Sequence, residues 1–137
     1  MQVATKGSYH IDIQENILEV DAHGPFDSDI IEQYNNEIKS AIGNFNKLPW
    51  GSLVVYHGNV LFSSDTEQSL SEVIKYRIKH GMIANASVIL DSHNTDLQQM
   101  QLHRVYQESK LPFHVFSNID HAKDWLVDYV EQQRPKN

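Results

Sequence analysis

The sequence contains no cysteine, so it forms no disulfide, thiolate zinc site or iron–sulfur cluster and offers no cysteine nucleophile. Glycine and proline are also scarce, with six and four residues. None of the glycine-rich motifs that hold phosphates or dinucleotides is present, and no nucleophile elbow Gly-x-Ser-x-Gly occurs. No apolar segment approaches the roughly 18 residues that a membrane span needs. We therefore expect no redox chemistry on cysteine and no membrane insertion.

Positive charge is limited as well, since 11 basic side chains face 18 acidic ones and give a formal net charge of −7. That balance opposes contacts with a phosphate backbone, so the chain is not expected to bind nucleic acid. With 137 residues, of which 40% are apolar, the chain can form one domain with a core but not two. We predict a single cytoplasmic domain over residues 1–137, with an ordered core at about 8–131 and polar tails at 1–7 and 132–137.

Hydrophobic periodicity predicts five strands and four helices in the order β-β-α-β-α-β-α-β-α. Apolar and polar residues alternate at 8–13 and at 16–22, which predicts an antiparallel hairpin. The apolar run at 53–56 is typical of a strand covered on both faces, and we place it at the centre of the sheet. Two more strands are predicted at 86–91 and 113–116, with helices at 27–45, 64–80 and 95–107 and a last helix behind a cap formed by Ser117 and Asp120.

This alternation predicts an α/β fold with a single-layer, mixed, five-stranded sheet. The first strand is expected to be antiparallel at an edge, and strands two to five are expected to be parallel. Four of the strands keep a polar or mixed face, so one face of the sheet is either partly covered by helices or in contact with a partner. The polar residues assigned to that face are Asp12, Glu19, Ser87 and His114.

Local patterns predict a helix cap and two core residues. Ser64 and Glu67 fit the reciprocal capping box at the start of the second helix. Trp125 and Leu126 are expected to close the core against the sheet, so Trp125→Ala should cost roughly 3 to 5 kcal/mol. Trp50 and Tyr56, near the central strand, either line a pocket or belong to the core.

The element order, together with the ending Phe116-Ser117-Asn118-Ile119-Asp120-His121-Ala122-Lys123-Asp124-Trp125-Leu126, resembles the SpoIIAA-like, STAS-related family of small bacterial domains. In that family a last strand ending in Phe leads, through an acidic turn, to a helix marked Ala-x-x-Trp-Leu. The similarity covers almost the whole chain and rests on a packing motif, so it bears on fold more than on function. It implies a noncatalytic regulatory or interaction module that binds a partner protein or a small ligand.

The resemblance also directs attention to hydroxyl groups before the second helix. Well-known members are anti-sigma-factor antagonists that are phosphorylated on a Ser in an Asp-Ser-(Ser/Thr)-Gly context. The matching stretch here contains Ser63 and Ser64, but the acid follows them and no glycine is present, so we expect no phosphorylation switch. A related branch, the SEC14-like carriers, implies an apolar ligand instead.

Parallel strands bring their C-terminal ends to one edge of the sheet, where open α/β sheets usually bind ligands. The ligand-binding residues predicted at this edge are His23, His57, Asp91, His93 and Asn118, with Asp21 and His10 beside them. Histidines change charge between about pH 5 and 8, so an anionic small molecule is expected to bind more tightly at pH 6 than at pH 8.

The alternative is a small hydrolase or lyase in which Asp91 orients and charges His93 for acid–base catalysis. That pair requires the fourth strand to continue through His93, and Asp91 to Asp96 fits equally an ordinary polar loop that caps the third helix. Eight histidines are present but none pairs at the i, i+4 spacing of helical metal sites, so no metal and no cofactor is expected, and a metal site assembled from residues distant in the sequence is left as an open alternative. The sequence leaves open whether the chain forms a homodimer.

Overall fold

The computed structural model describes residues 8–24, 28–45 and 49–133, so the expected tail at 1–7 and residues 134–137 of the expected tail at 132–137 lie outside it. The strands are β1 (Ser8–Gln14), β2 (Ile17–His23), β3 (Trp50–His57), β4 (Met82–Leu90) and β5 (Phe113–Phe116). The helices are α1 (Ser28–Ile42), α2 (Ser64–Lys79), α3 (Thr95–Tyr106) and α4 (Ile119–Gln133), with short 3-10 turns at Gly43–Phe45 and Gln107–Ser109. The predicted α/β fold with four helices and a mixed five-stranded sheet is confirmed.

The sheet has the strand order β1-β2-β3-β4-β5, with β1 antiparallel to β2 and the other pairs parallel. Glu15 and Asn16 connect β1 to β2, and Glu15 adopts a positive φ of 55° that a tight hairpin turn requires. β3 is buried at every position except His57, because strands flank it and helices cover both its faces. The predicted central strand is therefore confirmed.

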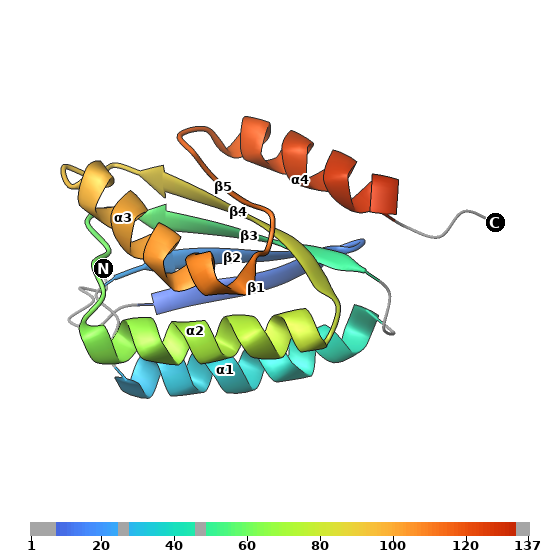
Figure 1. The fold of residues 1–137 in the computed structure, drawn as a ribbon, viewed down its shortest axis with the longest axis horizontal. Helices are drawn as coiled ribbons and strands as arrows, with labels where there is room; N and C mark the ends of the chain where they lie inside the picture. The colour runs from blue at the N-terminus through green and yellow to red at the C-terminus, as the bar shows by residue number, and fades with distance from the viewer. Residues whose placement is uncertain (1–7, 25–27, 46–48, 134–137) are drawn as a thin grey trace, which may run out of the picture.

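Helices cover the two faces of the sheet unequally. From β2 to β5, each strand lies directly beside the one before it, always on the same side. Crossover connections between parallel strands are right-handed, so the three connecting helices α1, α2 and α3 all lie on one face of the sheet. α4 follows the last strand and packs alone on the other face, mainly on β3 and β4 (Figure 1). None of the helices in the described residues is long and apolar enough to cross a membrane.

α4 approaches the sheet closely because Gly51 leaves room for it. A Cβ atom added at Gly51 would lie 2.7 Å from Leu126 Cδ1 and 2.9 Å from Val130 Cγ2. The buried stripe of α4, formed by Ala122, Leu126 and Val130, packs against apolar residues of β3 and β4. This contact covers the middle of the face, and β1 and the outer half of β2 extend beyond it.

The α4 face of the sheet carries polar side chains. The strand register places Asp12, Glu19 and His114 on it, and Lys123 of α4 reaches over to Glu19 with an N–O distance of 2.9 Å. The prediction of a partly covered, polar sheet face is thus confirmed. Ser87 was wrongly assigned to it, because Ser87 is one residue out of phase and lies buried on the opposite face, where its Oγ accepts a hydrogen bond from Asn85.

The cap of α2 lies one residue earlier than the sequence pattern suggests. Ser63, not Ser64, is the N-cap, and its Oγ accepts a hydrogen bond from the Thr66 amide at 3.2 Å. Glu67 does not fold back to the cap as the predicted capping box requires. Its carboxylate instead accepts two hydrogen bonds from Arg104 of α3, at 2.7 and 2.9 Å, and so joins the two helices.

Of the two tryptophans, Trp50 belongs to the core, as one of its two alternatives predicted, and the prediction that Trp125 is a core residue is wrong. Trp50 is fully buried, which settles its place in the core, whereas Trp125 is only partly buried. Trp125 packs on the outer side of α4 against the rings of His114, Phe116 and Tyr129. Leu126, as predicted, is fully buried against the sheet.

We expect Trp125→Ala to cost about 2 kcal/mol, less than the 3 to 5 kcal/mol typical of a fully buried large aromatic, because part of the ring already contacts water. Urea denaturation followed by circular dichroism measures this. A loss as large as that of a core tryptophan would show that the ring is more enclosed than the structure indicates.

Candidate functional site

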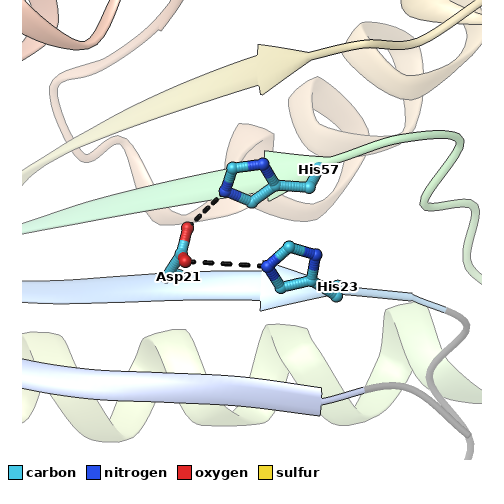
Figure 2. Close-up of side chains that lie close together, drawn as sticks. All are labelled: Asp21, His23 and His57. Carbon is cyan, nitrogen blue, oxygen red and sulfur yellow. Dashed lines mark hydrogen bonds and ion pairs between the residues drawn. The ribbon is translucent and has the colours of Figure 1, made fainter. Parts of the chain in front are cut away.

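Three polar side chains meet at the C-terminal ends of β2 and β3 (Figure 2). The carboxylate of Asp21 faces both imidazoles from one side, with Oδ1 at 2.5 Å from Nε2 of His57 and Oδ2 at 3.6 Å from Nε2 of His23. The two imidazole rings stack, with centroids 4.2 Å apart and planes inclined by 7°. We call Asp21, His23 and His57 the edge cluster.

The strand register explains the edge cluster. His23 and His57 are direct partners across the parallel β2–β3 pair, so their side chains stand next to each other on the same face. Asp21 precedes His23 by two residues and therefore shares that face. His10 of β1 is paired with Asp21 in register and continues the same row of polar residues.

The edge cluster is open to solvent on one side. The side chains of His23, His57 and Asp21 are 52%, 28% and 49% exposed. With both imidazoles neutral the cluster carries the single negative charge of Asp21, and with both protonated it carries a net charge of +1. The cluster is thus suited to a cation when the imidazoles are neutral and to an anion only when both are protonated.

Asp91 and His93 do not form the pair that the alternative hypothesis needs. β4 ends at Leu90, and Asp91 has a φ of 55°, so the strand does not continue through His93 and the two-residue alternation does not apply. Within the described residues, the one group of three clustered metal-ligating side chains contains neither of them. The structure therefore brings His23 and His57 together, and leaves Asp91 and His93 in an exposed loop.

A hydrogen-bond network that the sequence did not reveal holds the loops beside the edge cluster. Asn59, which follows β3 closely, accepts hydrogen bonds at Oδ1 from the His93 amide at 2.8 Å and from the Ser92 hydroxyl at 2.9 Å. From α3, Gln98 donates to the Gly58 carbonyl at 3.0 Å. The only sequence signal was a buried position for Gln98 in an amphipathic helix. These bonds fix the loop that leaves His57.

Two other predicted residues have structural roles. Asn118 caps α4, since its Oδ1 accepts a hydrogen bond from the His121 amide at 3.1 Å. Ser63 caps α2, and Ser64 is the first residue of that helix, so both hydroxyls lie at a helix N-terminus. Neither Asn118 nor the serines belong to the edge cluster.

A partly open pocket lies between the sheet and the α1–α2 layer. Its volume is about 30 Å³, and its lining residues include Tyr9, Tyr34, Tyr56, Phe62 and Leu70. Pockets that hold small-molecule ligands have volumes of roughly 300 Å³ or more, and a space of this size holds one or two water molecules. The pocket does not have room for the apolar ligand that a SEC14-like carrier would enclose.

Comparisons with known proteins add no relative. No protein-family model matches the chain, and no curated protein matches its sequence at a significant level. The geometry of the edge cluster and of the sheet around it therefore forms the basis for a functional proposal.

Proposed function

We propose that this chain is a noncatalytic regulatory or interaction module that binds a small ligand or a partner at the C-terminal edge of β2 and β3. The observation that supports it is the convergence of Asp21, His23 and His57 on one exposed edge. Polar side chains that converge at this edge of a parallel sheet are the usual setting for ligand recognition. The SpoIIAA-like resemblance of the element order favours the same kind of module.

The surroundings of the edge cluster favour binding over catalysis. His57 and His23 both face the carboxylate of Asp21, and in the described part of the chain neither imidazole has a hydrogen bond to a Ser or Thr hydroxyl. Nucleophilic catalysis requires such a hydroxyl within reach of the base. The cluster is also a shallow, exposed surface rather than the enclosed site that excludes water from a reaction.

A thermal-shift screen tests the proposal directly. Metabolites, anions and metal ions are added to the wild-type chain and to a His23→Ala/His57→Ala chain at pH 6 and at pH 8. A ligand at 100 times its Kd stabilises the folded state by about 2.7 kcal/mol, which raises Tm by several degrees. We expect at least one compound to raise the Tm of the wild type and to leave that of the double variant unchanged.

His103→Ala provides the matched control, because His103 is an exposed histidine on α3, outside the edge cluster. It should respond to the same compounds as the wild type does. A compound that raises the Tm of the wild type and of the double variant equally binds outside the edge cluster. If every stabilising compound in the screen does this, the proposed site is refuted.

A further inference from the structure

We propose that the edge cluster is a binding site for a divalent transition-metal ion, with His23, His57 and Asp21 as its ligands. The inference rests on the proposed function, since it names the chemical class of the ligand at that same edge. Two imidazoles and one carboxylate are a common ligand set for Zn²⁺, Co²⁺, Ni²⁺ and non-haem Fe²⁺. This chain supplies that set from β2 and β3 alone.

The distances between the donor atoms are close to those of a metal site. One ring nitrogen of each histidine and one carboxylate oxygen of Asp21 all lie within 4.8 Å of one another. In a tetrahedral zinc site with bonds of about 2.0 to 2.1 Å, ligand atoms are separated by about 3.4 Å. Nε2 of His23 lies 3.6 Å from Oδ2 of Asp21, and Nε2 of His57 lies 2.5 Å from Oδ1. The two rings are stacked with planes inclined by only 7°, so one of them must turn out of the stack before both nitrogens and one carboxylate oxygen surround an ion.

Both imidazoles already direct a nitrogen toward the same carboxylate. Nε2 of His57 faces Oδ1 of Asp21 and Nε2 of His23 faces Oδ2, so the three donors converge on one region (Figure 2). A metal ion in that region displaces the proton that lies between Nε2 of His57 and the carboxylate of Asp21, and this proton moves to Nδ1 of the same ring or, from a doubly protonated ring, to solvent. The exchange leaves the ion attached to two neutral imidazoles and one carboxylate, with a net charge of +1 for a divalent cation.

The backbone under the ligands is rigid. All three residues lie on strands, and the β2–β3 ladder keeps His23 opposite His57. Ligands on strands hold their geometry better than ligands on loops, which lowers the cost of arranging them around an ion. The ring stacking of the histidines, with centroids 4.2 Å apart, shows that their side chains are already close.

The exposed side of the edge cluster leaves coordination positions open. Structural zinc sites use four protein ligands, whereas sites with three keep a position for water or another molecule. The edge cluster has three such ligands and side-chain exposures of 52%, 28% and 49%. The bound ion therefore presents a free position to a carboxylate or imidazole of a partner or of a small molecule. The hard ions Mg²⁺ and Ca²⁺, which prefer oxygen ligands, should bind much more weakly.

Titration calorimetry of tag-free, chelator-treated protein at pH 7.5 tests the inference, first with Zn²⁺ and then with Co²⁺. We expect one equivalent to bind, and bound Co²⁺ to show the intense visible absorption of a four-coordinate site with histidine nitrogen ligands. His23→Ala, His57→Ala and Asp21→Asn should each weaken binding at least about 100-fold, more than the loss of an outer-shell partner does. His103→Ala and His114→Ala, at exposed histidines outside the cluster, should bind as the wild type does.

Two outcomes overturn the metal site. One is the absence of stoichiometric binding by the wild-type chain, and the other is binding that persists in the His23→Ala/His57→Ala chain, which marks adventitious surface histidines. Circular dichroism and Tm of each variant show that it remains folded. If metal binding fails while another compound still depends on His23 and His57 in the thermal-shift screen, the metal inference falls and the proposed function stands. If no compound depends on them either, both fall.

Discussion

Trp50→Ala is expected to destabilise the chain by about 4 to 5 kcal/mol, the largest effect of any single substitution proposed for it. Trp50 is fully buried, its ring stacks on Phe45 with centroids 4.9 Å apart, and its Nε1 donates a hydrogen bond to the His80 carbonyl at 2.9 Å. Replacement of Trp50 by Ala removes the apolar contacts of the ring and its stacking on Phe45, and it leaves the His80 carbonyl at the end of α2 without its hydrogen-bond donor. Since domains unfold at a cost of about 5 to 15 kcal/mol, the variant would be close to unfolded.

Urea denaturation followed by circular dichroism measures the effect, and Trp125→Ala is the matched control. The same residue type is removed in both variants, from a fully buried position in one and from a half-covered helix surface in the other. A loss at Trp50 no larger than that at Trp125 would contradict the core assigned here.

Tyr34→Phe is expected to cost about 2 to 3 kcal/mol, although it removes a single oxygen atom. The Tyr34 hydroxyl accepts a hydrogen bond from Nη2 of Arg77, which is buried among apolar side chains. Nε of Arg77 has no hydrogen-bond partner, and no ion pair to this guanidinium occurs in residues 8–24, 28–45 and 49–133. Hydrogen bonds to charged groups contribute about 1.5 to 3 kcal/mol, and a buried charge that loses one is costly.

Neighbouring phenols do not neutralise Arg77. Burial raises the pKa of Tyr56 and of Tyr106 above the ordinary tyrosine value, so both are uncharged at neutral pH. Arg77→Met should therefore be tolerated, or should stabilise the chain, because it replaces a buried cation by an apolar side chain of similar length.

A double-mutant cycle, measured by urea denaturation, separates the free energy of the Tyr34–Arg77 hydrogen bond from the other effects of the two substitutions. In the Arg77→Met background, Tyr34→Phe should cost less than about 1 kcal/mol, which gives a coupling free energy of about 1 to 2 kcal/mol. If Tyr34→Phe lowers the free energy of unfolding equally in the wild-type and Arg77→Met chains, the hydroxyl of Tyr34 does not stabilise the guanidinium of Arg77.

The sequence predicted the topology because strands and helices alternate along the chain and the apolar run of β3 has to lie at the centre of the sheet, which leaves few possible strand orders. It also predicted that His23 and His57 meet, since both end neighbouring parallel strands at the same edge. The position of Asp91 and His93 depended on where β4 ends. The run from Asp91 to Asp96 indicates a polar loop, but it does not fix whether the strand stops before Asp91 or continues through His93, and the positive φ of Asp91 decides that.

Other errors arise from one-residue ambiguities. Adjacent Ser63 and Ser64 both suit a helix cap, and only the chain geometry selects Ser63. Trp125 and Leu126 are adjacent on a helix, so their side chains diverge by about 100° and only Leu126 points squarely at the sheet. Ser87 lies in a strand buried on both faces, where hydrophobic alternation no longer reports which face a polar residue occupies.

Backbone amide chemical shifts, followed by NMR during titration with Zn²⁺ at pH 7.5 and with inorganic phosphate at pH 6, show whether ligands bind at the edge formed by Asp21, His23 and His57. We predict that the perturbed amides gather at residues 21–24 and 57–59 and that the perturbations disappear in the His23→Ala/His57→Ala chain. Perturbations that gather instead around Tyr34 and Leu70, which line the pocket between the sheet and the α1–α2 layer, or that survive in the double variant would contradict this placement.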